Sequence, residues 1–224
     1  MDLKLVIFDV DGTLVDSQAG LVASFQAAFE AVGEPAPARA DMLSVVGLSL
    51  PVAMARLAPG QTAAAQGEMA AAFRKVYQGH RATHGVASMP LYPGAKKILA
   101  DLAAREDVLL GVATGKSLRG VQALVEAHAL ERHFVTVQVA DDHPSKPHPS
   151  MVLTALAETG IAPRDAVMIG DTSFDMQMAA AAGVTGIGVS WGYHPVDALQ
   201  PAAMVLDQFD ALPGALETLW KDRP

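Results

Sequence analysis

The chain has 224 residues, enough for one domain with a full hydrophobic core or for one domain with a smaller insert. Hydrophobic residues make up 51% of it and charged residues 18%, a balance typical of a globular protein rather than a disordered one. The net charge of -8 argues against a nucleic-acid-binding protein, and the lack of cysteine excludes disulfides and thiolate chemistry. Neither a signal peptide nor a membrane span is evident, so we expect a cytoplasmic protein with no membrane partner.

The chain begins with a predicted buried strand over residues 3–8. Residues 17–85 then contain only helical patterns, with hydrophobic residues in helical phase over 21–32, 54–57 and 69–77. Turn residues such as Gly33 and the Pro59-Gly60 pair separate these segments. No part of this stretch has the pattern of a strand, so we expect it to be an all-helical insert.

Helices and strands alternate from residue 94 onward. We expect helices at 94–104, 118–127, 149–159, 173–182 and 212–220, and strands at 108–113, 134–139, 166–169, 184–189 and 203–206. Strands that read as continuous apolar runs between helices indicate a parallel sheet with both faces covered. The predicted fold is α/β, a doubly wound, Rossmann-like parallel sheet, with core residues 1–16 and 86–224 and a helical cap at 17–85.

Two carboxylates, Asp9 and Asp11, follow the first predicted strand, and Gly12 comes next. They lie at the carboxyl end of a strand, where open α/β sheets bind ligands. Two like charges so close together repel, so they require a cation, a proton or an anion-binding role. The alternative is a strand that simply runs into an Asp/Gly turn.

Polar residues also follow the second and third strands of the alternating region. Thr114-Gly115-Lys116-Ser117 opens a helix, whose free N–H groups favour an anion, although a plain Thr/Ser helix cap explains it as well. A phosphate-binding P-loop is excluded, because Leu110 stands where that motif needs glycine. Lys146 precedes Pro147, which stiffens its loop and suits it to a phosphate oxygen; otherwise it is a solvated surface lysine.

The next strand ends in Gly170-Asp171-Thr172-Ser173-Phe174-Asp175. Thr172 and Asp175 have the spacing of a helix capping box, which explains Asp175 without any ligand. Asp171 has no such explanation, because a carboxylate at the end of an apolar strand is costly unless it is paired or bound to a metal. Oxygen ligands alone favour Mg²⁺ over Zn²⁺.

The carboxylate pair, Thr-Gly, Lys-Pro and Gly-Asp-x-x-x-Asp fall in order after successive strands of one predicted sheet. In this order the chain resembles the haloacid dehalogenase-like hydrolase superfamily over essentially its whole length. Within it the chain is most similar to the capped group that resembles phosphoglycolate phosphatases. Ala182-Gly183-Val184 and Trp191-Gly192-Tyr193 extend the resemblance downstream.

The resemblance implies a role for each matching position. Asp9 would be the nucleophile that forms an aspartyl-phosphate, and Asp11 the general acid and then the base that activates water. Thr114 and Lys146 would bind phosphoryl oxygens, with backbone N–H groups near Gly12 and Gly115. The implied Mg²⁺ ligands are the Asp9 carboxylate, the Asp11 backbone carbonyl and the Asp171 carboxylate, with Asp175 beside them.

The expected function is hydrolysis of a small phosphorylated metabolite by a monomer or homodimer. A cap that closes over the site would exclude water and a folded protein substrate. Candidate cap contacts are Gly47-Leu48-Ser49-Leu50, Arg56 and Arg81. The alternatives are a phosphomutase or phosphotransferase similar to β-phosphoglucomutase, a non-catalytic binding module, and a dehalogenase, which the presence of Asp11 disfavours.

Overall fold

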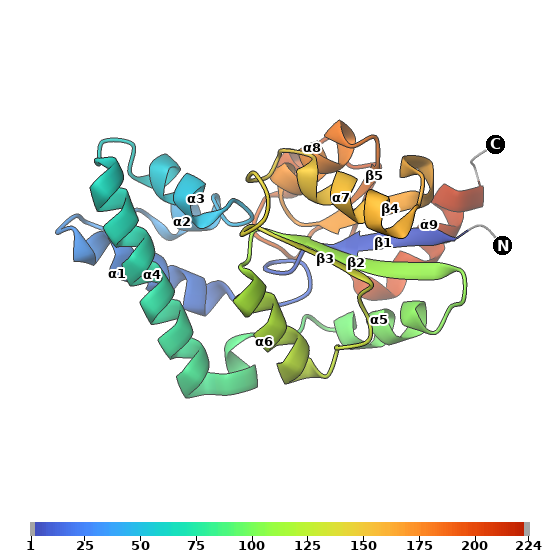
Figure 1. Cartoon of the computed structure of the whole chain (residues 1–224), viewed down its shortest axis with the longest axis horizontal. Coiled ribbons are helices and arrows are strands. Elements are labelled where there is room, and N and C mark those ends of the chain that lie inside the picture. Colours follow the sequence, from blue (N-terminus) through green and yellow to red (C-terminus); the bar gives the residue numbers. More distant parts are fainter. Residues whose placement is uncertain (1–2, 222–224) are drawn as a thin grey trace.

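The computed structural model describes residues 3–221, and its centre is a parallel sheet in the order β3-β2-β1-β4-β5-β6 (Figure 1). The strands are β1 (Lys4–Phe8), β2 (Val108–Thr114), β3 (Thr136–Val139), β4 (Ala166–Gly170), β5 (Thr185–Val189) and β6 (Met204–Leu206). Strand β1 lies between β2 and β4, and the strand order reverses on either side of it. Residues that follow β1 therefore emerge at the middle of the carboxyl edge, where doubly wound sheets bind ligands.

Helices cover both faces of the sheet, as the apolar strands require. They are α5 (Ala95–Ala103), α6 (Leu118–His128), α7 (Ser150–Thr159), α8 (Ser173–Ala181) and α9 (Leu212–Lys221). Val6 and Phe8 of β1 share one buried cluster with residues of α5, α6 and α9, whereas Leu5 and Ile7 share another with α7 and α8. This alternation along a strand places the two helix layers on opposite sides (Figure 1).

The segment between β1 and α5 is helical, as expected, and lies beyond the carboxyl edge of the sheet (Figure 1). It contains α1 (Gln18–Ala31), α2 (Arg39–Leu43), α3 (Leu50–Leu57) and α4 (Ala63–His84), followed by the short 3₁₀ helix η1 (Gly85–Ser88). Helices α1 and α4 pack side by side, with Phe25 and Phe73 edge to face at 4.8 Å between ring centroids. Most of the buried side chains of this segment form a third hydrophobic cluster, which Phe174 of α8 joins from the core.

Some element boundaries differ from the sequence-based expectation. The strand predicted from residue 134 begins at Thr136, although the Val135 backbone N–H already donates to Leu110 of β2 at 2.9 Å. Helix α2 was not predicted. The start of α4 was not predicted either, because it lies at Ala63, fourteen residues before Tyr77, among alanines that show no hydrophobic periodicity. Three more 3₁₀ turns, η2 (Pro163–Asp165), η3 (Val196–Ala198) and η4 (Phe209–Ala211), complete the elements. Within residues 3–221, no helix has both the length and the hydrophobicity needed to cross a membrane.

Candidate active site

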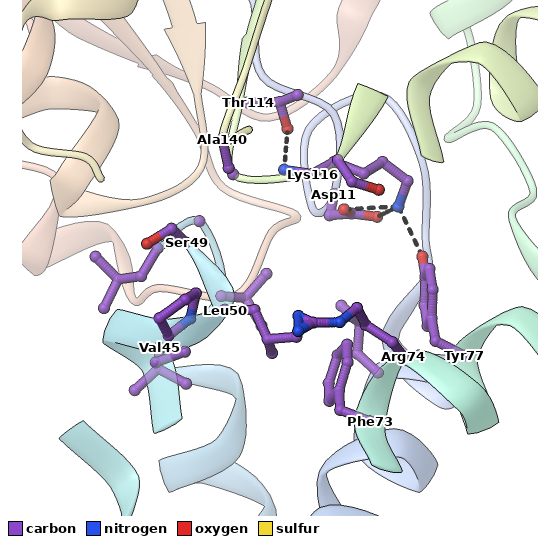
Figure 2. A pocket seen from close by; sticks show the side chains of 18 of the residues that line it. Asp11, Val45, Ser49, Leu50, Phe73, Arg74, Tyr77, Thr114, Lys116 and Ala140 are labelled. Atoms are coloured by element: carbon purple, nitrogen blue, oxygen red, sulfur yellow. Dashed lines mark hydrogen bonds and ion pairs between the residues drawn. The ribbon is translucent and has the colours of Figure 1, made fainter. Parts of the chain in front are cut away.

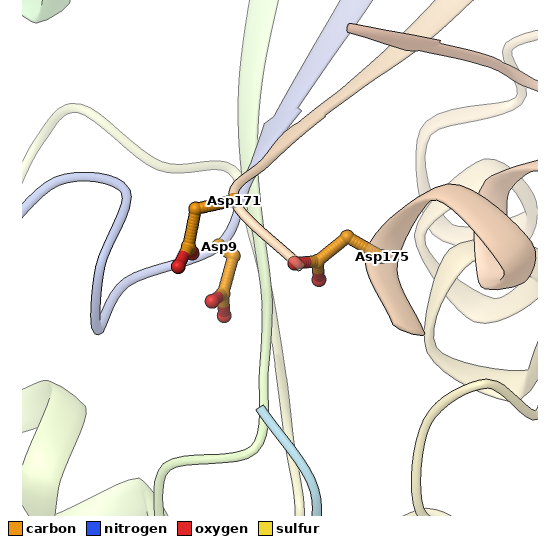
Figure 3. A group of neighbouring side chains, drawn as sticks. All are labelled: Asp9, Asp171 and Asp175. Carbon is orange, nitrogen blue, oxygen red and sulfur yellow. The ribbon is translucent and has the colours of Figure 1, made fainter. Parts of the chain in front are cut away.

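Three buried aspartates meet at the carboxyl edge of the sheet (Figure 3). Asp9 follows β1, Asp171 follows β4, and Asp175 lies in the first turn of α8. Since β1 and β4 are neighbours in the sheet, Asp9 and Asp171 leave it side by side. One carboxylate oxygen from each of the three side chains lies within 4.8 Å of the others. The structure thus brings together all three acidic side chains expected around a metal.

Lys146 is buried against this cluster. Its ammonium lies 2.8 Å from Asp9 Oδ1 and 2.6 Å from Asp175 Oδ1, and its side chain is 0% exposed. Burial by itself lowers the pKa of Lys146, but Asp175 and Asp9 raise it above its ordinary value, so the side chain is charged. Lys146 is therefore an internal cation beside Asp9 rather than a solvated surface lysine.

Asp175 caps α8 and also fixes Lys146. Its Oδ2 accepts hydrogen bonds from the Thr172 backbone N–H at 3.1 Å and from Thr172 Oγ1 at 2.7 Å, which completes the capping box. Its other oxygen accepts the hydrogen bond from Lys146. Both oxygens of Asp175 are thereby engaged, one of them by the Lys146 ammonium.

Asp171 is positioned by hydrogen bonds and by glycine. Thr13 Oγ1 donates to Asp171 Oδ1 at 2.9 Å, and the Tyr193 backbone N–H donates to Oδ2 at 2.8 Å. Gly12 has a φ of +92° and presses so close that a Cβ there would overlap the Asp171 carboxylate; a Cβ on Gly192 would do the same. The backbone on both sides of Asp171 therefore requires glycine.

The electrostatics of this cluster fit a bound cation. Burial raises the pKa of Asp9 to about 6, an effect that Lys146 partly opposes and Asp175 reinforces. Burial, together with the charges of Asp9 and Asp175, raises the pKa of Asp171 well above its usual range. Among the described residues no donor has hydrogen-bond geometry to either Asp9 oxygen, although Lys146 lies close by. A hard divalent cation would add to the single positive charge that Lys146 provides for three buried carboxylates.

Asp11 faces away from this cluster and pairs with Lys116. Lys116 Nζ lies 2.8 Å from both Asp11 oxygens, and Ser17 Oγ donates to Asp11 Oδ1 at 2.5 Å. Lys116 also donates to the Tyr77 hydroxyl of α4 at 2.7 Å (Figure 2). The sequence patterns place Lys116 within the helix-opening segment 114–117 and in an excluded P-loop, and they place Tyr77 in a hydrophobic helical stripe; they assign a catalytic role to neither. The position of Lys116 after β2, level with Asp11 after β1, is the signal that could have linked them.

Thr114 and Gly115 end β2 beside Asp9 and Asp11, as expected. Thr114 is buried, and its Oγ1 accepts a hydrogen bond from the Lys116 backbone N–H at 3.3 Å. A Cβ on Gly115 would overlap the carbonyl of Gly47, which belongs to the helical insert. The insert and the sheet edge therefore meet here through backbone alone.

A cavity of about 290 Å³ separates the insert from the sheet edge (Figure 2). Asp9, Asp11, Thr114, Gly115 and Lys116 line its core side, and on the insert side it is lined by residues that include 45–51, Phe73, Arg74, Tyr77 and Gln78. The segment Gly47-Leu48-Ser49-Leu50 is thus where the sequence predicted it.

The two arginines expected to contact substrate do not line this cavity. The Arg56 guanidinium lies over the Phe174 ring, 5.4 Å from its centroid, and Arg81 borders a different surface hollow. An arginine that does line the cavity is Arg74 of α4, and within residues 3–221 no ion pair engages it. Helical phase does not separate Arg74 from Arg81, because residues seven apart lie on the same face of α4; Arg81 instead lies two turns further along, in the last turn of the helix.

Comparison with known proteins agrees with this geometry. Residues 6–189 match the haloacid dehalogenase-like hydrolase family, and the chain therefore belongs to that family. The probable phosphatase IndB of Dickeya dadantii is 36% identical over 97% of this chain and 95% of its own. The phosphoglycolate phosphatase of Escherichia coli K12 is 30% identical, covering 95% of this chain and 92% of its own. The expectation of a phosphatase of this family is confirmed at the level of class.

The chain is also similar to a protein of another named activity and to solved structures of lower sequence identity. The tyrosine-protein kinase PtkA of Mycobacterium tuberculosis is 34% identical over 87% of this chain and 64% of its own length. A solved hydrolase of Pseudomonas syringae superposes with a TM-score of 0.83 at 24% identity, covering 96% of this chain and 98% of its own. A β-phosphoglucomutase of Clostridium difficile gives 0.82 at 18% identity, with 99% and 100% covered. Both solved structures support the fold, and the predicted α/β fold is confirmed.

Proposed function

We propose that the protein is a Mg²⁺-dependent phosphatase that hydrolyses a small phosphorylated metabolite through a phosphate ester on Asp9. One observation carries the proposal. The Asp9 carboxylate is buried at the middle of the sheet edge and lines the cavity, with Lys146 2.8 Å from its Oδ1 and no hydrogen-bond donor to its Oδ2 among the described residues. An oxygen that is unshielded by hydrogen bonds and faces a cavity is suited to attack phosphorus.

In the first step, an Asp9 oxygen would attack phosphorus while the bond from phosphorus to the leaving oxygen breaks. Asp11 would protonate that oxygen, as its place beside Asp9 on the core side of the cavity allows. In the second step, water would attack phosphorus, the bond to Asp9 would break, and the water proton would pass to Asp11. Inorganic phosphate would then leave, and both carboxylates would return to their starting states.

Asp9, Asp171 and the backbone carbonyl of Asp11 would hold the Mg²⁺ ion, with Asp175 beside it. The Asp9 Oδ2, which accepts no hydrogen bond from a described residue, and the raised pKa of Asp171 support this assignment. When bound, Mg²⁺ would neutralise charge on the phosphoryl group and on the aspartates. Thr114 and the backbone N–H groups near Gly12 and Gly115 would bind phosphoryl oxygens, and Lys146 would contribute its charge from beside Asp9.

We also propose that residues 17–85 act as a cap over a core formed by 1–16 and 86–224. The hydrophobic cluster of this segment, which takes only Phe174 among its buried residues from the core, and the cavity beneath it support that division. A cavity of about 290 Å³ suits a small metabolite, and phosphoglycolate is a natural first candidate given the relatives named above. A cytoplasmic location and a monomeric or homodimeric state stay predictions.

The proposal is tested by incubating the purified protein and Mg²⁺ with a panel of phosphoglycolate, sugar phosphates, nucleotides and pyrophosphate. We expect release of inorganic phosphate from a small monoester without any sugar bisphosphate. A phosphomutase would instead isomerise a sugar phosphate when activated by the bisphosphate. A phosphotransferase, which the kinase relative makes worth testing, would move phosphate to an added hydroxyl acceptor. Either result without phosphate release contradicts the phosphatase proposal.

A further inference from the structure

A buried lysine to which the proposed reaction gives no role lies beside Asp11. The Lys116 side chain is only 4% exposed, and its ammonium is 2.8 Å from each Asp11 oxygen. Burial alone lowers the pKa of Lys116, but Asp11 and Tyr77 raise it above its ordinary value. Lys116 is therefore a fixed cation in contact with the side chain that would carry protons.

All hydrogen bonds between described residues and the Asp11 side chain are donated to it. Lys116 donates to both oxygens, and Ser17 Oγ donates to Oδ1. These contacts come from both sides of the carboxylate, so they fix its orientation relative to Asp9 and the cavity. A group that transfers protons during a reaction needs such a fixed geometry.

Residues on both sides of the cavity hold the Lys116 side chain in place. A Cβ on Gly120 of α6 would lie 2.7 Å from Lys116 Cγ, so the missing side chain at Gly120 leaves room for the lysine stem. On the insert side, the Tyr77 hydroxyl accepts a hydrogen bond from Lys116 (Figure 2). The Tyr77 ring stacks on Phe73 at 5.9 Å between centroids, which ties it to the hydrophobic cluster of the insert.

We infer that Lys116 is a positioning residue for the hydrolytic step, which holds Asp11 as the base that accepts the water proton. Tyr77 makes this hold depend on the insert lying against the core. The inference rests on the proposed function, because it concerns the second step of that reaction. In this step water forms a bond to phosphorus, the bond from phosphorus to Asp9 breaks, and Asp11 takes the proton while Lys116 keeps its own.

The two steps can be separated with p-nitrophenyl phosphate. p-Nitrophenolate is a good leaving group and needs little protonation, so formation of the ester on Asp9 depends weakly on Asp11 for this substrate. Hydrolysis of that ester still depends on the base. A defect in positioning Asp11 therefore lowers kcat and leaves kcat/KM nearly unchanged, because kcat/KM reports the steps up to the first irreversible one.

The experiment measures burst and steady-state kinetics of Lys116→Met with p-nitrophenyl phosphate and Mg²⁺. We expect kcat to fall about 100-fold, with less than ~3-fold change in kcat/KM and a burst of about one p-nitrophenolate per active site. Lys116→Arg retains the cation and should restore most of kcat, whereas Tyr77→Phe should produce the same split to a smaller degree. Lys75→Met, which removes an exposed lysine from the same helix as Tyr77, is the matched control and should behave as the unaltered protein.

Equal falls in kcat and kcat/KM would overturn the inference, because they would mean that Lys116 binds the phosphoryl group or supports the fold. An unchanged kcat would overturn it as well. A second measurement does not need activity: the Lys116 ammonium should give a slowly exchanging ¹H–¹⁵N NMR signal that is lost in Asp11→Asn. A rapidly exchanging ammonium contradicts the inference. If the unaltered protein hydrolyses no phosphate ester, the proposed function fails, and this spectrum still decides whether Asp11 holds Lys116.

Discussion

The ammonium of Lys146 lies 2.8 Å from the carboxylate of Asp9, and both side chains are almost completely buried. The same ammonium also binds Asp175, so one internal cation is shared between the nucleophile candidate and the start of α8. Charges in such a place are costly to bury and more costly to leave unpaired. This relationship makes the site sensitive to any change in its charge balance.

Lys146→Met should both destabilise and inactivate the protein. It leaves Asp9 and Asp175 buried without their shared cation, which we expect to lower the free energy of unfolding by about 3–5 kcal/mol. Lys4→Met, which breaks a 2.6 Å pair with Asp165 in which both side chains are 19% exposed, is the control and should cost less than about 1 kcal/mol. Urea unfolding with Mg²⁺ removed measures both, and similar losses in the two variants would contradict this account of Lys146.

Asp9→Asn and Asp11→Asn should each remove hydrolysis of p-nitrophenyl phosphate. The amide of the first is a poor nucleophile, and that of the second cannot act as the base, so we expect kcat to fall by at least about 1,000-fold and about 100-fold, respectively. Asp142→Asn, at an exposed position outside the cavity, serves as the control. Full activity in Asp9→Asn would refute the assignment of the nucleophile.

Removal of divalent metal should abolish activity, and Mg²⁺ should restore it. Asp171→Asn should weaken Mg²⁺ binding by at least about 10-fold, because it replaces an anionic ligand with a neutral amide. Asp101→Asn, on the exposed face of α5, should bind Mg²⁺ as the unaltered protein does. Isothermal titration calorimetry measures the two affinities, and equal binding by both variants would exclude Asp171 as a ligand.

The raised pKa of Asp9 predicts how the stability of the metal-free protein depends on pH. Its pKa is about 6 in the folded protein and about 4 in an unfolded chain, so between these values the folded state binds more protons. Stability should therefore fall as pH rises from 4 to 6, by up to about 3 kcal/mol. Asp9→Asn lacks this titration, so its urea-unfolding free energies should decline less over that range. Parallel pH curves for the two proteins would be evidence against the raised pKa.

Arg74 should favour substrates that carry a second anion. An arginine that lines the cavity and forms no ion pair with a described residue is free to bind a carboxylate. Arg74→Gln should raise KM about 10-fold for phosphoglycolate and much less for ethyl phosphate, which lacks the carboxylate. Arg56→Gln, which alters an arginine outside the cavity, should change neither value. A similar increase in KM for both substrates would show that Arg74 does not recognise the carboxylate.

The sheet and the residues at its edge were predictable because the strands are fully buried. A strand covered on both faces reads as an unbroken apolar run, and the first polar residue after it marks the carboxyl edge. Asp9, Thr114 and Asp171 all follow that rule. The capping box of Thr172 and Asp175 was predictable as well, because its spacing is local.

The contacts between the insert and the core were not predictable from these patterns. Which arginine faces the cavity depends on the angle at which α3 and α4 meet the sheet edge, and no local spacing encodes that angle. For the same reason the sequence indicated Arg56 and Arg81, whereas Arg74 lines the cavity. The hydrogen bond between Tyr77 and Lys116 joins residues 39 positions apart and arises only when the insert lies against the core.

The Asp175 carboxylate caps α8 with one oxygen and accepts a hydrogen bond from Lys146 with the other, so a single side chain affects both the formation of α8 and the electrostatics around Asp9. Substitutions at the start of α8 that raise the thermal stability would therefore also change the charge environment of Asp9. Thermostable variants of this enzyme that retain their turnover should instead gain their stability elsewhere, for example on the exposed face of α9, far from the carboxyl edge of the sheet (Figure 1).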